Sequence, residues 1–150
     1  MAADLADLEA YAGGLIANLT GAERRALARK IAITLRGLEQ RRIALQRNVD
    51  GSPYEPRKPR LRDKGGRIRR TMFAKLRTAR YLKVEASESE AMVTFADQVQ
   101  RIAQVHHVGL RERVSTKPYR EISYPARDLL GFRDDYEASI ADLVVLHLAQ

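Results

Sequence analysis

The pattern of hydrophobic and polar residues along the chain predicts long helices first and mixed helices and strands later. Apolar residues three and four positions apart predict a helix over Asp4–Leu19, in which Gly13–Gly14 predicts a kink or a break. Thr20 and Glu23 have the spacing of a capping box. A second helix is therefore predicted from there to about Arg47.

The apolar stripe of the second helix contains one charged position. Arg42 falls where the stripe of apolar residues should continue. One interpretation is that its stem crosses the edge of the core and its charge reaches water. The other is that it pairs with a group across a subunit contact. The stripe itself is predicted to consist of Leu27, Ile31, Leu35, Leu38 and Leu45.

Short elements follow the polar middle of the chain. Met72, Phe73 and Leu76 predict a short helix over Met72–Ala79. Two β-prone runs, Tyr81–Val84 and Ala91–Phe95, flank a polar turn and predict an antiparallel hairpin.

A further helix is predicted over Asp97–Val108, closed by Gly109. Its spacing places Ile102, Val105 and Val99 on the inward face.

The last part of the chain alternates between extended and helical patterns. The pattern predicts a loop or an irregular strand over Leu110–Lys117 and a strand over Tyr119–Tyr124 that Pro125 stops. Asp134 or Asp135 is predicted to cap a final helix.

This order of elements predicts the α+β class: a small, mostly antiparallel sheet packed with helices, preceded by long N-terminal helices. We expect residues 1–150 to form a single domain, with a helical part at 1–49 and an α+β core at 71–150. Between them lies an extended basic loop, residues 50–70, which we call the arm.

The arm, Asp50–Arg70, holds three prolines, three glycines, eight Lys or Arg residues and three acids. Such a segment does not form a core helix or a central strand, and connections of this length are usually functional or disordered. Tyr54 either stacks on a partner or pins the arm to the body. The candidate contacts with a partner or a neighbouring subunit are Tyr54, Arg57, Lys58, Arg60, Arg62, Lys64 and Arg67.

The net charge of +8 is unevenly distributed. The stretch Arg24–Lys83 has twenty Lys or Arg and four acids, a balance of +16, which leaves −8 for the rest. This asymmetry suits either a polyanionic partner or a subunit whose basic part meets an acidic part of its neighbour. The chain has no cysteine, and no apolar run is long enough to span a membrane, so a soluble protein without disulfides is expected.

The candidates for catalysis are weak. His106 and His107 are adjacent, so on a helix they point about 100° apart and do not chelate one metal together. We interpret them as structural or surface residues. No phosphate-binding, dinucleotide-binding or nucleophile-elbow motif is present. We therefore expect neither an enzyme nor a cofactor.

Three stretches of the chain resemble one known family. Ile102–Gly109 (IAQVHHVG), Tyr124–Gly131 (YPARDLLG) and Arg42–Lys58 (RIALQRNVDGSPYEPRK) resemble elements of the phage virion morphogenesis proteins. Together they match the tail completion, or tail terminator, proteins of temperate contractile-tailed phages. Val108 stands where an aromatic residue is usual in the family, and Asp128 where a proline is common.

This resemblance implies a structural role in the virion, at the head-proximal end of the tail, after assembly in the host cytoplasm. Such proteins form a ring, usually hexameric, that stops tube and sheath polymerisation and offers a surface to the neck of the head. The implied partners are other copies of the chain, tail tube or sheath proteins and head-neck connector proteins. Genomic DNA passes only transiently, and no membrane is involved.

The resemblance also assigns structural roles to individual residues. Arg127 is either an intrachain brace or a subunit contact, because its rigid guanidinium suits both. The structural residues of the matched motifs are Asp50, Gly51, His106, Gly109, Pro125 and Gly131.

Two rival functions remain open at this point. The basic stretch favours a nucleic-acid-binding protein, although no reader motif is recognisable. A metal-dependent hydrolase that uses the histidines is the weaker rival.

Overall fold

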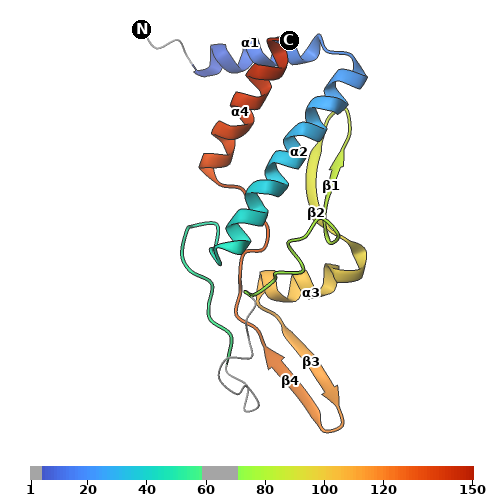
Figure 1. The fold of residues 1–150 in the computed structure, drawn as a ribbon, viewed down its shortest axis with the longest axis vertical. Coiled ribbons are helices and arrows are strands. Elements are labelled where there is room, and N and C mark those ends of the chain that lie inside the picture. Colours follow the sequence, from blue (N-terminus) through green and yellow to red (C-terminus); the bar gives the residue numbers. More distant parts are fainter. Residues whose placement is uncertain (1–4, 59–70) are drawn as a thin grey trace. The chain divides into compact units, whose positions relative to one another are not determined.

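A computed structural model describes residues 5–58 and 71–150, and within these ranges the chain is α+β, as predicted (Figure 1). It has four helices and four strands in the part described. In chain order these are α1 Leu5–Ala17, α2 Gly21–Ala44, β1 Leu82–Ala86, β2 Ala91–Phe95, α3 Asp97–Val108, β3 Arg111–Thr116, β4 Tyr119–Ser123 and α4 Asp134–Leu148.

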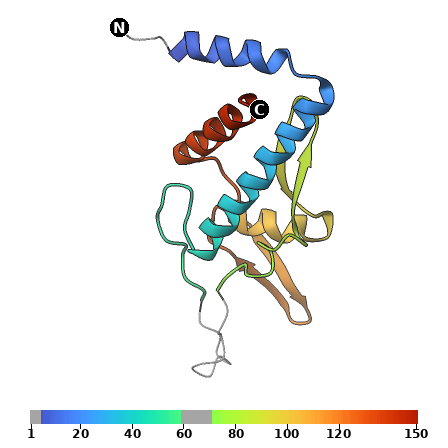
Figure 2. The same ribbon diagram turned by 45° about the horizontal axis from the view of Figure 1, so that its top comes forward.

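The strands form two separate antiparallel pairs in the described residues, where a single small sheet was expected. β1 pairs with β2, which confirms the predicted hairpin. β3 pairs with β4, and the register shifts between Arg113 and Ser115, so the irregular strand was the correct alternative for this stretch. Figures 1 and 2 show this second hairpin extending away from the C-terminal end of α3.

The predicted start of α2 is confirmed in detail. The Thr20 N–H donates to Oε2 of Glu23 at 2.7 Å, and the Glu23 N–H donates to Oγ1 of Thr20 at 3.2 Å. The two residues thus satisfy N–H groups that have no partner within the helix, and the hydrogen bonds lower the pKa of Glu23.

Two predictions about helices were wrong. α1 is continuous through Gly13–Gly14, so the helix does not break, because each glycine costs only about 1 kcal/mol relative to alanine. Residues 72–79 form turns instead of a short helix. Phe73 has φ 64°, a left-handed conformation that ends any helix, and the Gln46 side chain bonds both the N–H and the carbonyl of Met72.

The chain is grouped into two compact units. One comprises residues 1–35, 84–93 and 134–150, and the other comprises residues 36–83 and 94–133. The first has eleven Asp or Glu and four Lys or Arg, a net charge of −7; the second has eight and twenty-three, a net charge of +15. We call them the acidic unit and the basic unit. That residues 1–150 fold as one domain stays a prediction.

Most of the core lies in the basic unit. Ile43, Leu82 and Leu129 are fully buried there, and each stabilises the fold by about 1.5–3 kcal/mol relative to an exposed side chain. Val99 and Val105 point inward as predicted, whereas Ile102 is 47% exposed and Leu45, just past the end of α2, is 71% exposed. The last two predictions were wrong.

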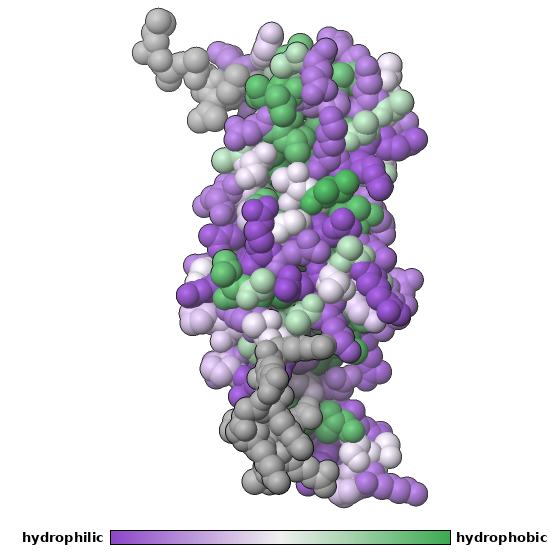
Figure 3. Space-filling model, in the orientation of Figure 1, coloured by the Kyte–Doolittle hydropathy of each residue, from purple (hydrophilic) through white to green (hydrophobic). Residues whose placement is uncertain are grey.

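The acidic unit has a smaller core. Its buried side chains come from the first half of α2 and from α4: Leu27, Ala28, Ala32 and Tyr136. Figure 3 shows hydrophobic residues, in green, lying among hydrophilic ones on the face in view, so apolar side chains are not confined to the interior.

Candidate functional site

The matched motifs meet in the basic unit, where polar groups join distant parts of the chain. The Val49 N–H donates to Oδ2 of Asp128, and the Asp128 N–H donates to Oδ1 of Asn48, both at 3.0 Å. The Tyr54 hydroxyl donates to the Asp128 carbonyl at 2.7 Å. We call this arrangement, formed by residues 46–56 and 127–131, the clasp.

A buried ion pair supports the clasp from α2. Arg42 is 5% exposed and Glu39 is 3% exposed, and Nη2 of Arg42 lies 2.6 Å from Oε2 of Glu39. Nε of Arg42 also donates to Oε1 of Glu39 at 3.2 Å, and Nη1 donates to the carbonyls of Arg47 and Asp128 at 2.8 and 2.6 Å. The same carboxylate accepts the Gly131 N–H at 3.1 Å.

The interpretation in which the Arg42 charge reaches water was therefore wrong, because Glu39, one turn earlier in the same helix, pairs with it in the interior. A subunit contact through Arg42 stays a prediction. The spacing of residues along the helix did not predict this ion pair, because the same pattern is typical of an exposed glutamate.

The start of the arm is fixed by Arg127. This side chain is 4% exposed, and it donates from Nε to the Glu55 carbonyl at 2.8 Å and from Nη2 to the Pro56 carbonyl at 3.3 Å. Burial lowers the pKa of its guanidinium. These contacts support the intrachain brace; a subunit contact through Arg127 has no observation in its favour and stays a prediction.

Tyr54 is pinned to the body. It is 4% exposed, its hydroxyl is bonded within the clasp, and its ring meets the Phe73 ring edge-on at 5.9 Å. Burial raises the pKa of Tyr54 to about 12. The observed contacts thus favour pinning over stacking on a partner.

The two histidines both serve the packing of the basic unit. His106 lies between the rings of Phe73 and Tyr124, with centroid distances of 5.1 and 4.5 Å. Nδ1 of His107 accepts the Leu129 N–H at 3.1 Å. Burial and the nearby Arg127 charge lower the pKa of His106, whose Nδ1 is buried without a hydrogen-bond partner among the described residues.

Two glycines of the motifs are required by space or backbone conformation. Gly109 has φ 79° and caps α3 through its N–H to the Val105 carbonyl, and a Cβ there would lie 2.7 Å from the Ala126 nitrogen. A Cβ at Gly131 would collide with the Val49 side chain.

The other motif residues shape the turns. Gly51 has φ 86° in the turn that Asp50 stabilises, where Oδ1 of Asp50 accepts the Ser52 N–H at 2.9 Å. These bonds lower the pKa of Asp50. β4 ends at Ser123, two residues before Pro125, where the sequence predicted a strand up to Tyr124.

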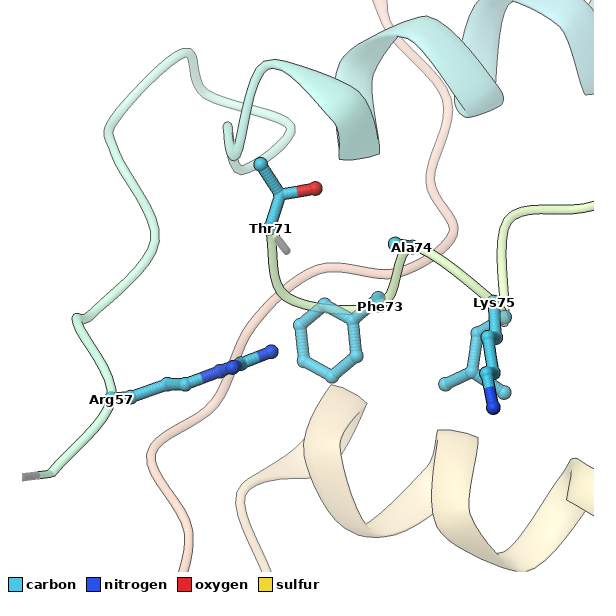
Figure 4. Close-up of a pocket in the computed structure, with 6 residues that line it drawn as sticks. Arg57, Thr71, Phe73, Ala74 and Lys75 are labelled. Atoms are coloured by element: carbon cyan, nitrogen blue, oxygen red, sulfur yellow. The ribbon is translucent and has the colours of Figure 1, made fainter. Parts of the chain in front are cut away.

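A cavity of about 330 Å³ lies beside the start of the arm (Figure 4). In Figure 4 the Arg57 side chain points toward the Phe73 ring, and Lys75 lies on the other side of that ring. We call this cavity the Phe73 pocket. Its lining residues are Arg57, Thr71, Phe73, Ala74, Lys75 and Leu76.

The structure divides the predicted site residues. Tyr54 and Arg127 are buried in the clasp, whereas Arg57 and Lys58 are exposed. Arg60, Arg62, Lys64 and Arg67 lie outside the described residues. Glu39, Asn48 and Asp128 were missed as contributors, and only the placement of Asn48 and Asp128 inside the matched motifs pointed to them.

The described residues hold no group of three or more His, Cys, Asp or Glu side chains that could bind a metal ion. Nor does any helix in that part of the chain have the length and apolar character to cross a membrane.

Comparison with known proteins identifies the family of this chain. The model of the phage virion morphogenesis family matches residues 3–149. The chain belongs to this family. One relative, tail completion protein S of Escherichia phage P2, is 42% identical over 137 residues, which cover 90% of this chain and 91% of that protein. No solved structure matches the chain significantly.

Asp128 bonds the arm side of the clasp through both its backbone and its side chain. Its N–H donates to Asn48, and its carboxylate accepts the Val49 N–H. A proline at this position would supply neither group.

Proposed function

We propose that this chain completes the phage tail by forming a ring, expected to be hexameric, at its head-proximal end. The ring stops polymerisation of the tail tube and sheath and provides the surface that the head-neck connector joins. The observation that carries the proposal is the 42% identity to tail completion protein S of phage P2 along nearly the whole length of both chains. We infer that no catalysis is involved, on the strength of the family.

The distribution of charge supports a ring. A closed ring needs two different, complementary patches on each subunit. The acidic unit at −7 and the basic unit at +15 offer such patches within one chain. Electrostatic complementarity of this kind selects the partner and accelerates association.

The arm is the second contact in this proposal. Arg127 and Tyr54 fix its first residues to the body, so the exposed Arg57 and Lys58 leave the clasp from a defined position. We propose that Arg60, Arg62, Lys64 and Arg67 then reach a neighbouring subunit or the tail.

The proposal is tested by depletion and rescue. Without the chain, the producing cells should yield tails of uncontrolled length that carry no heads, and a supplied copy should restore normal virions. Negative-stain images and mass spectrometry of purified tails provide the measurements. Normal tails in the absence of the chain, or its absence from rescued tails, would contradict the proposal.

The arm has its own experiment. Replacing Arg60, Arg62, Lys64 and Arg67 with serine keeps the length of the arm and removes four charges. We expect normal circular dichroism but poor incorporation into tails. The same test on a variant that lacks 58–67 separates length from charge, and a deletion that assembles fully would show that the arm is dispensable.

Nucleic-acid binding is the second candidate, and the +15 charge of the basic unit favours it. It requires tight duplex binding that weakens steeply as salt rises. Fluorescence anisotropy with a labelled duplex measures this directly. Weak duplex binding at physiological salt would contradict this second candidate, and DNA would then only pass through the proposed ring.

A further inference from the structure

Helix α4 has apolar residues on two faces. Tyr136 is buried and Ile140 is half-buried on one side, whereas the opposite side is exposed, with Val145 and Leu146 each 67% accessible. A helix that is apolar on every side is normally covered on every side. We call the exposed stripe the outer face of α4; its residues, three and four positions apart, are Ala138, Ala141, Asp142, Val145 and Leu146.

The charge around the outer face indicates what covers it. α4 has four Asp or Glu residues and no Lys or Arg, and it lies in the acidic unit. Asp142 is the single charge within the stripe. A suitable partner therefore presents apolar surface beside one or two cations.

The Phe73 pocket of the basic unit has that composition. Phe73, Ala74 and Leu76 supply apolar surface, and Arg57 and Lys75 supply cations from two different segments (Figure 4). Phe73 is held there by a backbone at φ 64°, which is costly for a residue with a side chain. Such strain is concentrated at functional positions, and here it places an aromatic ring in the lining of the pocket, which also contains Arg57 and Lys75.

We propose that the outer face of α4 docks on the Phe73 pocket of a second copy of this chain, with Asp142 paired to Arg57 or Lys75. The contact rests on the proposed ring and specifies its subunit interface. It joins two different surfaces, so a joined pair of copies still has one free surface of each kind, and further copies add until the series closes.

The absence of cysteine makes a clean cross-linking test possible. Tails are assembled with the double variant Ala74→Cys and Leu146→Cys as their only form of this protein, then oxidised and separated without reductant. A ladder of dimers and higher species is expected. Each single variant should remain a monomer.

Other results would overturn the docking. A double variant that cross-links only within one chain, at monomer mass, means that α4 covers its own copy. Dimers of the single variant Leu146→Cys mean that two α4 helices meet each other. No cross-link in tails that contain the protein also contradicts the docking but leaves the proposed function standing. A protein missing even from wild-type tails contradicts the proposed function itself.

Charge reversal provides the second part of the test. In the cysteine background, Asp142→Arg should lower the yield of the ladder about tenfold, because like charges then meet across the contact. Adding Arg57→Glu should restore most of that yield. Glu137→Arg makes the same charge change on α4 outside the outer face and should leave the yield unchanged. Loss of the ladder by Glu137→Arg alone would show a general charge effect and would contradict the specific pair.

Discussion

The clasp and the outer face of α4 place polar and apolar residues in opposite ways. In the ion pair that supports the clasp, the Arg42 guanidinium and the Glu39 carboxylate are almost completely buried, and each is held by backbone groups of distant segments. On α4 two large apolar side chains are two-thirds exposed, and Asp142 lies one turn before them. The polar groups of the first region find partners within the chain, whereas the apolar surface of the second is the one for which we propose a second copy as the partner.

This difference explains where the family motifs lie. Network residues such as Arg42, Asn48 and Tyr54 need defined side-chain groups at defined positions, so they leave a motif in the sequence. An apolar contact surface needs only suitable size and shape, so α4 carries no motif. The motif residues that the structure describes therefore build the scaffold more than the contact.

The largest effect is expected from opening the buried ion pair. Glu39→Gln leaves the Arg42 charge buried without its counter-ion, and we expect unfolding free energy to fall by about 3–5 kcal/mol. Urea denaturation followed by circular dichroism measures this. Glu88→Gln is the matched control, since it removes an exposed partner of Arg24 and Arg25 and should cost less than about 1 kcal/mol. Equal effects of the two changes would show that burial does not set the difference.

A methyl group at the end of α3 should have the next largest effect. Gly109→Ala forces a left-handed backbone, which costs about 1–2 kcal/mol, and also places Cβ against the Ala126 backbone. Gly13→Ala is the control: nothing lies within 4 Å of that position in α1, and alanine should stabilise the helix by up to about 1 kcal/mol. Thermal unfolding of the two variants should shift in opposite directions.

Acid should weaken the clasp through His106. Because its pKa is lowered in the folded protein, the unfolded chain takes up a proton more readily than the folded one. The contribution is fully present above the ordinary histidine pKa of about 6.5 and is lost as the pH falls below it. The urea midpoint should therefore drop between pH 7.5 and 5.5, and His106→Phe should reduce that drop. An unchanged pH dependence in the variant would remove His106 as a cause.

The smallest effect is expected on the outer face of α4. Val145→Ser and Leu146→Ser should change the unfolding free energy of the isolated chain by no more than about 0.5 kcal/mol, because both side chains are already exposed. Tyr136→Ala, on the buried side of the same helix, should cost several kcal/mol. A large loss in the serine variants would mean that the outer face is covered within the chain.

The sequence predicted the helices and strands better than it predicted the contacts between distant segments. Capping at Thr20, the bounds of α3 and the β1–β2 hairpin follow from local patterns, and local hydrogen bonds do determine them. The turns after Thr71 escaped prediction because Gln46, twenty-six residues earlier, holds Met72 in place of a helical partner.

The candidate site shows the same limit. The matched motifs pointed to segments that meet in the basic unit, but the exposed or buried state of Arg42 and Arg127 depends on groups far along the chain. The spacing of apolar residues shows only which face of a helix its own pattern favours for burial. It gives no information on the carbonyl of Asp128, eighty-six residues later, that accepts a hydrogen bond from Arg42.

The clasp also dictates when this chain becomes competent during synthesis. The bonds of the clasp and of the supporting Glu39–Arg42 pair join residues 39–56 to residues 127–131, separations of 71 to 92 residues. Contacts between such distant parts of a chain form late in folding, after the intervening loop has closed. A nascent chain on the ribosome thus lacks the clasp until nearly nine-tenths of it has been made. Until then the bonds that hold residues 54–56 against Arg127 and Asp128 have no partner, so the order of translation makes this the last part of the basic unit to become fixed.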